Sequence, residues 1–380
     1  MTRNAVAVVA GVFALLLDVW TVAPAPNLPL LIPAVIVPEI APWGAIVALL
    51  ALAVSLRWGR GVARLAGLAF GSAALVCALL PLAELPGTIA ASDAAMRAAL
   101  GNAADDGPRF DLHRFFFGRK LDPRVRVTHD LPVLTRDGTR LALDLYRAPG
   151  AGPHPAVVVI YGGGWRGGLR SDTASEDRRL AALGYDAIAI EYRLAPQYRF
   201  PVELDDVDDA LATIARNARA WGVDPRRVAL LGRSAGGELA LLAAYRRQPL
   251  TIRAVVAYYP PVDLRGGYLE PRLFDPGHIR MLVRDYLGGP PDAAPGAYRA
   301  ASPIDAVRAG LPPTFVVGGA RDQLVSLRFQ RDFRDALRAH GDTVVALEFP
   351  WSNHAFDEIP YGLGGQLARN YVAQFLTATL

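Results

Sequence analysis

The chain of 380 residues contains one cysteine, Cys77, so it cannot form a disulfide within itself, and cysteine usage indicates no compartment. No cluster of cysteine and histidine has the spacing of a metal site, and we expect neither a metal nor another cofactor. Acidic and basic residues are evenly mixed after Met96, so no basic stripe predicts a nucleic-acid partner despite the net charge of +4. Internal repeats and low-complexity tracts are also absent from the sequence.

Charge is scarcest near the N-terminus. Between Ala5 and Leu85 the charged residues are Asp18, Glu39, Arg57, Arg60, Arg64 and Glu84. Crossing about 30 Å of hydrocarbon takes roughly 20 apolar residues, and three stretches approach that length. They run from Ala5 to Val22, from Ile40 to Leu56 and from Leu65 to Leu82. We therefore expect residues 1–86 to anchor the chain in a bilayer through about three transmembrane helices, with a Pro-rich connector over 24–42. Asp18 is expected near the interface or against neighbouring helices.

The basic residues of this region predict its orientation. Arg3 precedes the first stretch, Arg57, Arg60 and Arg64 lie between the second and third, and the connector has none. Because basic loops stay in the cytoplasm, the rest of the chain is expected on the extracytoplasmic side of the cell membrane. A signal peptide cleaved near Ala23-Pro24-Ala25 is an alternative for the first stretch and leads to the same side. The C-terminal domain would lie in the cytoplasm only if the first apolar stretch did not cross the membrane.

From residue 124 short β-rich runs alternate with helical stretches. The expected strands are Arg124–Val133, Arg140–Tyr146, Pro155–Tyr161, Tyr185–Ile190, Arg227–Leu231, Arg253–Tyr258, Thr314–Val317 and Thr343–Phe349. The first two are joined by a turn at 136–139 and predict a hairpin. Continuous apolar runs such as Ala156–Ile160 are typical of strands buried on both faces. Residues 124–380 are therefore expected to form an α/β domain, with a mostly parallel eight-stranded sheet and helices on both faces.

Two segments outside this alternation are candidates for covering a site. The Pro- and Gly-rich insertion Gly266–Ala301, between the sixth and seventh strands, is expected to form a lid or cap. Residues 87–123 are expected to be a linker, and Asp93–Lys120 could contribute to the same cover.

A serine lies where a strand gives way to a helix. Ser234 stands in Gly232-Arg233-Ser234-Ala235-Gly236, directly after an apolar run and before a helical stretch. The two glycines permit a tight turn that exposes the hydroxyl to a base. The pentapeptide alone also fits an ordinary helix start, so its interpretation depends on partners elsewhere in the chain.

Candidate partners follow other strands. His354 follows the last strand, and Asp322 follows the seventh in Gly318-Gly319-Ala320-Arg321-Asp322. Since the carboxyl ends of parallel strands meet at one edge, we expect Ser234, His354 and Asp322 to come together as nucleophile, base and orienting acid. Asp322 could instead cap a helix near Leu324, with Asp263 as the substitute acid. A structural loop histidine is the alternative for His354.

A glycine-rich loop follows the third strand in Tyr161-Gly162-Gly163-Gly164-Trp165. Glycines there let peptide N–H groups approach a substrate oxygen, so the amides of Gly163, Gly164 and Ala235 are the expected oxyanion hole. Tyr161 and Trp165 are candidate substrate-binding residues, and Trp165 could equally pack under the loop.

Two further features of this part of the sequence have other interpretations. Gly162, Gly164 and Gly167 also satisfy a dinucleotide-binding pattern, with Glu191 as the ribose acid, but they follow the third strand and leave Ser234 and His354 unexplained. Arg193 with Asp205 and Asp206 is interpreted as a structural ion pair.

Three motifs together resemble the esterase/lipase branch of the α/β-hydrolases, which includes hormone-sensitive-lipase-like carboxylesterases and acetyl- and feruloyl-esterase-like enzymes. They are Gly232–Gly237, Tyr161–Trp165, and Glu191–Pro196 with Phe200-Pro201. The resemblance covers about residues 125–380 and implies an α/β-hydrolase fold with the order Ser234, Asp322, His354. The family usually has histidine where this chain has Tyr161, and aspartate or histidine where it has Arg233. These departures affect loop geometry and substrate preference, and they leave the triad and its backbone donors in place.

The expected function is hydrolysis of carboxylic esters, of small molecules or lipids, by a membrane-anchored serine hydrolase that forms an acyl-enzyme. An acyltransferase or an amide or formamide hydrolase on the same triad is an alternative. A binding module that kept the fold without catalysis is another. Acyl length, alcohol type and oligomeric state do not follow from the sequence.

Overall fold

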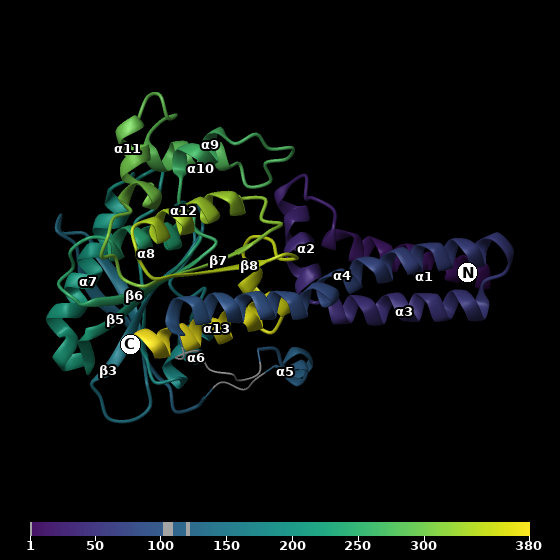
Figure 1. The fold of residues 1–380 in the computed structure, drawn as a ribbon, viewed down its shortest axis with the longest axis horizontal. Coiled ribbons are helices and arrows are strands. Elements are labelled where there is room, and N and C mark those ends of the chain that lie inside the picture. The colour runs from purple at the N-terminus through teal and green to yellow at the C-terminus, as the bar shows by residue number, and fades with distance from the viewer. Residues whose placement is uncertain (1, 102–108, 119–121) are drawn as a thin grey trace.

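The computed structural model describes residues 2–101, 109–118 and 122–380. Its N-terminal part contains α1 (Arg3–Asp18), α2 (Leu28–Glu39), α3 (Ala41–Trp58) and α4 (Gly61–Leu100). Helices α1, α3 and the first half of α4 form an elongated bundle that projects from one end of the molecule (Figure 1). Among the described residues, three helical segments are long and apolar enough to cross a membrane: Arg3–Thr21, Ala41–Trp58 and Gly61–Leu100.

Small residues bring the helices of the bundle into close contact. Gly11 of α1 lies so near α4 that an added Cβ would be 2.6 Å from the carbonyl oxygen of Gly67. The Ser55 hydroxyl donates a hydrogen bond to the Ala7 carbonyl across the bundle, at 3.3 Å. Asp18, at the end of α1, is buried against α3 beside Gly44. Close backbone approach through small side chains is typical of helix packing in membranes.

Two expectations about the N-terminal part differ from the structure. The Pro-rich connector contains a helix, α2, because Asn27 caps its first turn and Pro29 occupies a position where no N–H is needed. The boundary expected at residue 86 falls inside α4, which continues through Pro81 and Pro86 to Leu100. Beyond the bundle, Leu85, Ile89 and Met96 pack on the core of the larger part, and this packing sustains the helix where prolines would otherwise favour a break. Residues 102–108 and 119–121 of the expected linker lie outside the described residues.

An eight-stranded sheet organises the rest of the chain, in the order β1-β2-β4-β3-β5-β6-β7-β8. The strands are β1 (Arg126–Leu134), β2 (Arg140–Arg147), β3 (His154–Ile160), β4 (Asp186–Ile190), β5 (Val223–Arg233), β6 (Ile252–Tyr258), β7 (Thr314–Gly319) and β8 (Val344–Phe349). β1 and β2 form the expected hairpin, β2 pairs antiparallel with β4, and the remaining pairs are parallel. The expected fold class is confirmed.

Both faces of the sheet are covered. In β3, Ala156, Val158 and Ile160 point into one core and the intervening Val157 and Val159 into the other, as the continuous apolar run predicts. One core includes side chains of α7 (Val202–Trp221), α8 (Ala235–Ala244) and α12 (Leu327–Ala339). The second includes side chains of α4, α6 (Ala174–Ala182) and α13 (Leu363–Thr379).

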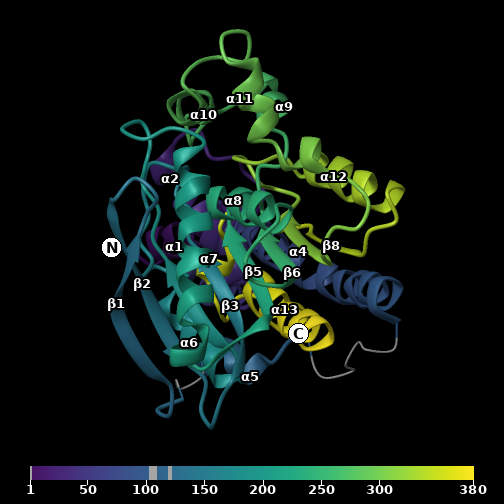
Figure 2. The same ribbon diagram turned by 90° about the vertical axis from the view of Figure 1, so that its left-hand side faces the viewer.

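The insertion between β6 and β7 forms three short helices: α9 (Leu264–Leu269), α10 (Ile279–Leu287) and α11 (Pro295–Ala300). They lie together on one side of the molecule, whereas α5 (Leu112–Phe117) lies on the other (Figures 1 and 2). Helix α5 and the described residues around it therefore do not share this cover, contrary to the expectation for residues 93–120.

Candidate active site

The nucleophile candidate occupies a strained turn between β5 and α8. Ser234 has φ 52° and ψ −121°, a conformation that non-glycine residues rarely adopt. A Cβ at Gly232 would lie 2.1 Å from the Gly236 carbonyl oxygen, and a Cβ at Gly236 would lie 2.2 Å from that of Tyr161. Glycine is therefore required on both sides of the serine for the chain to turn this sharply against the neighbouring strand.

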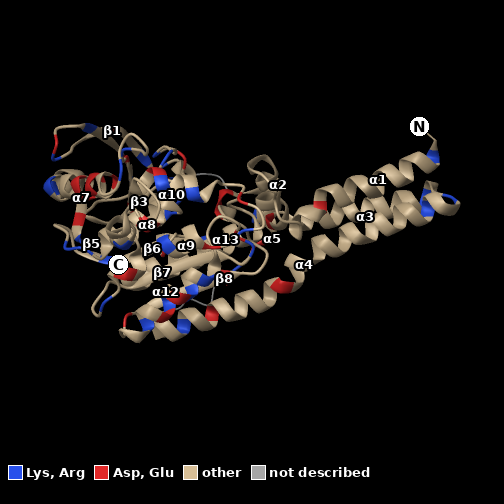
Figure 3. Ribbon diagram, turned by 90° about the horizontal axis from the view of Figure 1, so that it is seen from above, with Lys and Arg blue, Asp and Glu red and all other residues tan. Residues whose placement is uncertain are grey.

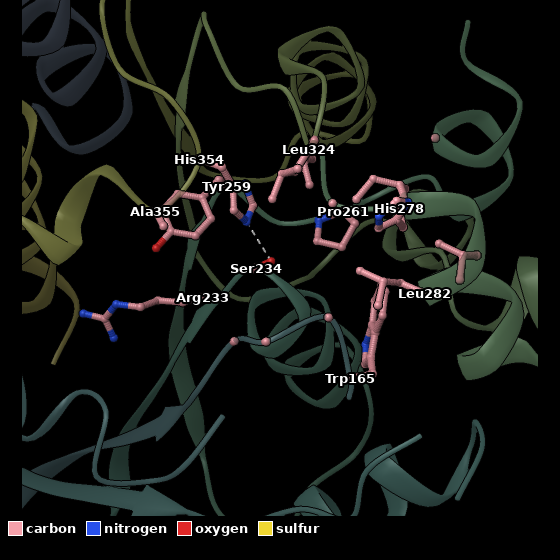
Figure 4. Close-up of a pocket in the computed structure, with 18 of the residues that line it drawn as sticks. Trp165, Arg233, Ser234, Tyr259, Pro261, His278, Leu282, Leu324, His354 and Ala355 are labelled. Carbon is pink, nitrogen blue, oxygen red and sulfur yellow. Dashed lines mark hydrogen bonds between the residues drawn. The ribbon is translucent and has the colours of Figure 1, made fainter. Parts of the chain in front are cut away.

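Three loops at the carboxyl ends of β5, β7 and β8 bring Ser234, Asp322 and His354 together. His354 Nε2 lies 2.9 Å from Ser234 Oγ, and His354 Nδ1 lies 2.8 Å from Asp322 Oδ2. Figure 4 shows the imidazole directly above the serine hydroxyl. These are hydrogen-bond distances, so the imidazole can take the serine proton at one nitrogen while the carboxylate holds the other.

Asp322 contacts both His354 and the backbone that follows it, but no helix of the described chain begins near Leu324, since α12 starts at Leu327. The Asp322 side chain is fully buried; Oδ2 contacts the histidine, and Oδ1 accepts hydrogen bonds from the amides of Leu324 and Val325, both at 2.8 Å. The alternative acid, Asp263, caps α9 through the amide of Gly266. Local hydrogen bonds thus fix the orientation of the carboxylate that meets His354.

The glycine loop after β3 has a conformation that suits backbone donors. Gly163 has φ 124°, and a Cβ there would lie 2.2 Å from the Gly167 carbonyl oxygen. Gly162, Gly163 and Gly164 line the same cavity as Ser234. In the described part of the chain, no hydrogen bond uses the amide of Gly163, Gly164 or Ala235. These three N–H groups are free to bind a ligand oxygen.

Trp165 connects this loop to the helix behind the serine and to the cover. Its indole N–H donates to Glu238 Oε2 at 3.0 Å, and its ring stacks on Tyr286 of α10 at 4.2 Å. The Tyr286 hydroxyl donates to the same carboxyl group. Burial, partly offset by these two hydrogen bonds, raises the pKa of Glu238 well above its usual value. Trp165 lines the cavity and also links the loop to α8 and α10, and its contact with a substrate stays a prediction.

Tyr161 is held by a reciprocal contact beneath the loop. Its hydroxyl donates to the Tyr192 carbonyl, the Tyr192 hydroxyl donates to the Tyr161 carbonyl, both at 3.1 Å, and the rings stack at 4.4 Å. Tyr161 also contributes to the cavity lining. Since its hydroxyl already has a partner, its contribution to the cavity is its ring.

Arg233 points away from Ser234 and His354 (Figure 4). Its guanidinium is buried 2.5 Å from Asp357 Oδ2, and the Tyr259 hydroxyl donates to the other oxygen of that carboxylate. The Tyr259 ring in turn lies 4.4 Å from the His354 ring. The residue before the serine is thereby tied to the chain segment just after the histidine. No local sequence pattern indicates this link, because its two ends are 124 positions apart.

A cavity of about 680 Å³ surrounds the serine hydroxyl. Its lining is mainly apolar and includes residues that the sequence did not single out, from α2, the loop before α10, α10 itself and the loop after β7: Leu28, His278, Met281, Leu282 and Leu324. The insertion therefore forms part of the cavity wall, as expected of a cap. A mostly apolar cavity beside a hydroxyl that is hydrogen-bonded to an imidazole can hold the acyl part of a substrate.

The N-terminal region contacts both loops that bear the histidine and the acid. Gln323 accepts from the Ala25 amide at 2.9 Å and donates to the Ala25 carbonyl at 3.1 Å. Glu39, fully buried, accepts from the Ser352 hydroxyl at 2.5 Å and from the Gly364 amide at 2.6 Å. The catalytic edge of the sheet thus faces the base of the helical bundle.

Two remaining interpretations can now be compared with the structure. Arg193 pairs with Asp206 at 2.7 Å as expected, but Asp205 pairs instead with Arg136 at 3.0 Å. Glu191, the ribose-binding acid of the dinucleotide alternative, accepts a hydrogen bond from the Ala142 amide. The Glu191 carboxylate, which directly follows β4, is therefore already hydrogen-bonded to β2.

Known proteins resemble parts of this chain. The BD-FAE family model matches residues 143–337, about half of the chain. A probable carboxylic ester hydrolase, LipM, of Mycobacterium tuberculosis is 36% identical over 57% of this chain and 53% of its own length. Esterase LipC of the same organism is 32% identical over 66% of this chain and 65% of its own length. The chain therefore spans between half and two thirds of these relatives.

Solved structures share the fold. The hyperthermophilic esterase of Pyrobaculum calidifontis superimposes with a TM-score of 0.59, at 26% identity, over 79% of this chain and 94% of its own. The chain belongs to the BD-FAE family, within the hormone-sensitive-lipase-like esterases of the α/β-hydrolase superfamily.

Proposed function

We propose that the protein hydrolyses carboxylic esters through an acyl-enzyme on Ser234. The observation that carries this proposal is the pair of contacts from Asp322 to His354 and from His354 to Ser234, at 2.8 and 2.9 Å, inside an apolar cavity. Kinship with proteins named as esterases supports the same reaction class.

The first half-reaction transfers the acyl group to the enzyme. Ser234 Oγ attacks the acyl carbon while His354 Nε2 takes the hydroxyl proton, and Asp322 stabilises the resulting imidazolium. The negative charge on the former carbonyl oxygen is bound by the free amides of Gly163, Gly164 and Ala235. When the tetrahedral intermediate collapses, the alcohol leaves with the proton from His354.

The second half-reaction restores the enzyme. His354 takes a proton from a water molecule, whose oxygen attacks the ester carbon on Ser234. The acid leaves, and the serine oxygen regains its proton from the imidazole. Trp165 and the ring of Tyr161 are proposed to contact the bound acyl group, since both line the cavity.

A chain-length panel of nitrophenyl esters tests this proposal. Ser234→Ala is expected to lower kcat by about 10³-fold or more, because members of a triad act as a unit. Ser171→Ala is the matched control, since Ser171 lies on the surface and is expected to leave the rate unchanged. Near-wild-type cleavage by Ser234→Ala would refute the assignment.

The other reactions open to the triad differ in a measurable way. An acyltransferase would pass the acyl group to an added alcohol in preference to water, and an amide hydrolase would cleave anilides as fast as esters. A non-catalytic module would leave Ser234 unlabelled by a fluorophosphonate. Hydrolysis is preferred because the relatives are named as ester hydrolases.

We also propose that α1, α3 and the first half of α4 anchor the chain in the cell membrane. Residues 1–86 are then the anchor and residues 124–380 the catalytic domain, with the end of α4 as a rigid connection. Arginines mark the far end of the bundle in Figure 3, where the N-terminus and the α3–α4 turn lie. Basic residues favour the cytoplasm, so the catalytic domain belongs on the outer side. The contacts of Val22 and Ala25 with the Asp322 loop support retention of the first helix.

A further inference from the structure

Large apolar side chains are exposed on three segments near the base of the helical bundle. They belong to α2, α5 and the loop between α9 and α10, and we call them the apolar rim: Leu28, Ile32, Leu112, Phe117, Leu273 and Phe274. Leu273 is 84% exposed and Phe117 is 76% exposed. Isolated surface leucines are ordinary, but a gathering of this kind on one end of a molecule marks an interaction site.

The apolar rim faces the end from which the bundle projects. Figure 1 shows α2 and α5 at the base of the bundle and the α9–α10 loop extending toward α2. Phe116 of α5 packs edge-on against Trp43, at the start of α3, with ring centroids 4.8 Å apart. Trp43 is itself 46% exposed, and tryptophan is typical of the level where a helix leaves the hydrocarbon. The rim therefore lies where the surface of a bilayer holding the bundle would be.

Two of these three segments, α2 and the α9–α10 loop, form part of the cavity wall, whereas no described residue of α5 lines it. Leu28 of α2 lines the cavity and is 56% exposed, and Met281 of α10 lines it and is 45% exposed. Between them, Leu324 lies against Gly277 of the α9–α10 loop on one side and the α2 cluster on the other. A residue that both lines a cavity and is exposed lies at its opening. The opening is therefore bordered by the apolar rim.

We propose that the apolar rim is immersed in the bilayer surface and that the cavity takes its substrate from the bilayer. This inference rests on the proposed ester hydrolysis and names the substrate class: a lipid-soluble ester with a long acyl or alkyl chain. Burial of the rim among lipid chains removes its apolar surface from water, which favours this placement. The catalytic edge of the sheet faces the bundle, so Ser234 lies inward of the opening.

The route of the substrate follows from this placement. An ester dissolved in the outer leaflet passes between α2 and the α9–α10 loop until its carbonyl reaches Ser234, while the far end of its chain stays among lipids. The cavity has a volume of about 680 Å³, and its apolar lining replaces the lipid contacts of the part of the ester that enters it. Long chains then need no transfer through water.

The test uses the full chain in phosphatidylcholine vesicles with two esters. One is 4-methylumbelliferyl palmitate dissolved in the vesicles, and the other is water-soluble 4-nitrophenyl acetate. Leu273→Gln/Phe274→Gln changes two rim residues that do not line the cavity, and Ile32→Gln changes a third from another element. Leu134→Gln/Leu183→Gln is the matched control, because both of these leucines are exposed outside the rim.

Both rim variants are expected to lose about tenfold or more in kcat/KM for the palmitate and less than about twofold for the acetate. The control variant is expected to keep its kcat/KM for both esters. Equal loss on both esters, or no loss on the palmitate, would overturn the inference while leaving ester hydrolysis intact. Failure of the proposed function is a different outcome: the wild type would cleave neither ester, or Ser234→Ala would cleave both.

Discussion

Ser234 is held in an unfavourable backbone conformation by contacts that tolerate only glycine at 232 and 236. The same close packing recurs in the loop that faces it, where Gly163 combines φ 124° with a carbonyl oxygen 2.2 Å from its missing Cβ. At the residue scale, the geometry of the site therefore depends on glycines, whose lack of a side chain allows close backbone packing. The reactive groups can approach because backbone lies directly against backbone.

Gly163→Ala tests this feature. The added methyl group would displace the loop and its amide, and loss of one oxyanion donor lowers kcat by about 10²–10³-fold. Gly296→Ala on α11, where an added Cβ meets nothing within 4 Å, is the matched control. Steady-state kinetics on a nitrophenyl ester is the measurement. A Gly163→Ala enzyme with unchanged kcat would show that this amide does not bind the oxyanion.

Single residues also show what sequence can and cannot predict. Ser234, Asp322 and His354 each follow a recognisable strand, so their meeting at one edge followed from the parallel sheet. The pairing of Arg233 with Asp357 did not, because no local pattern relates two buried charges on different loops. Glu39 was visible as a rare acid in an apolar region, but its partner Ser352 lies 313 positions away.

At the scale of elements, α2 connects the bundle to the catalytic loops. Its last residue, Glu39, holds the loop of His354 through Ser352 and the start of α13 through Gly364. The segment before it holds the loop of Asp322 through Gln323. The connector expected from the sequence thus contacts both loops, through Glu39 of α2 and through Ala25 before it.

Glu39→Ala is expected to lower kcat by about tenfold while changing KM little. Removal of the carboxylate leaves a buried hydroxyl and a buried amide without their partner, at a cost of about 1–3 kcal/mol, so the histidine loop would shift. Glu39→Gln keeps an acceptor for one of the two donors and should retain more activity. Identical kinetics for wild type and Glu39→Ala would contradict a supporting role.

The first turn of α7 contains a buried carboxyl, that of Glu203, which has no hydrogen-bond partner among the described residues. Burial raises its pKa to about 7 from 4.5. Between these values the folded chain binds a proton that the unfolded chain has lost, so this group lowers the free energy of unfolding as pH rises. Below about pH 4.5 Glu203 is protonated in both the folded and the unfolded chain, so its effect on the free energy of unfolding vanishes.

Glu203→Gln is therefore expected to stabilise the protein at pH 8 by up to about 3 kcal/mol and to have little effect near pH 4.5. Thermal unfolding in detergent at both values measures the difference between variant and wild type. A difference that does not grow with pH would mean that Glu203 is ionised in the folded chain at a normal pKa.

At the scale of the whole molecule, the helical bundle and the α/β domain are joined by direct contacts. The loops of Asp322 and His354 face the bundle, and the segments that carry the apolar rim lie near its base (Figure 1). The sequence predicted the two parts and their order. It could not predict their mutual placement, which depends on contacts between segments about 300 positions apart.

The membrane orientation gives a prediction at this scale. In sealed, right-side-out vesicles the catalytic domain is expected to be digested by external trypsin, because the arginines at the far end of the bundle favour the cytoplasm. Detergent should then add cleavage at the arginines of the far end of the bundle: Arg3, Arg57, Arg60 and Arg64. A catalytic domain protected until detergent is added would place it on the cytoplasmic side.

Covalent labelling of the full chain with a fluorophosphonate, followed by mass mapping of the modified residue, tests the central claim most directly. The triad predicts one adduct, on Ser234, that forms at a rate lowered by about 10²-fold or more in His354→Ala. Loss of ester hydrolysis should follow the extent of labelling. An adduct on another residue, or full hydrolytic activity in a chain that carries no label, would contradict the account.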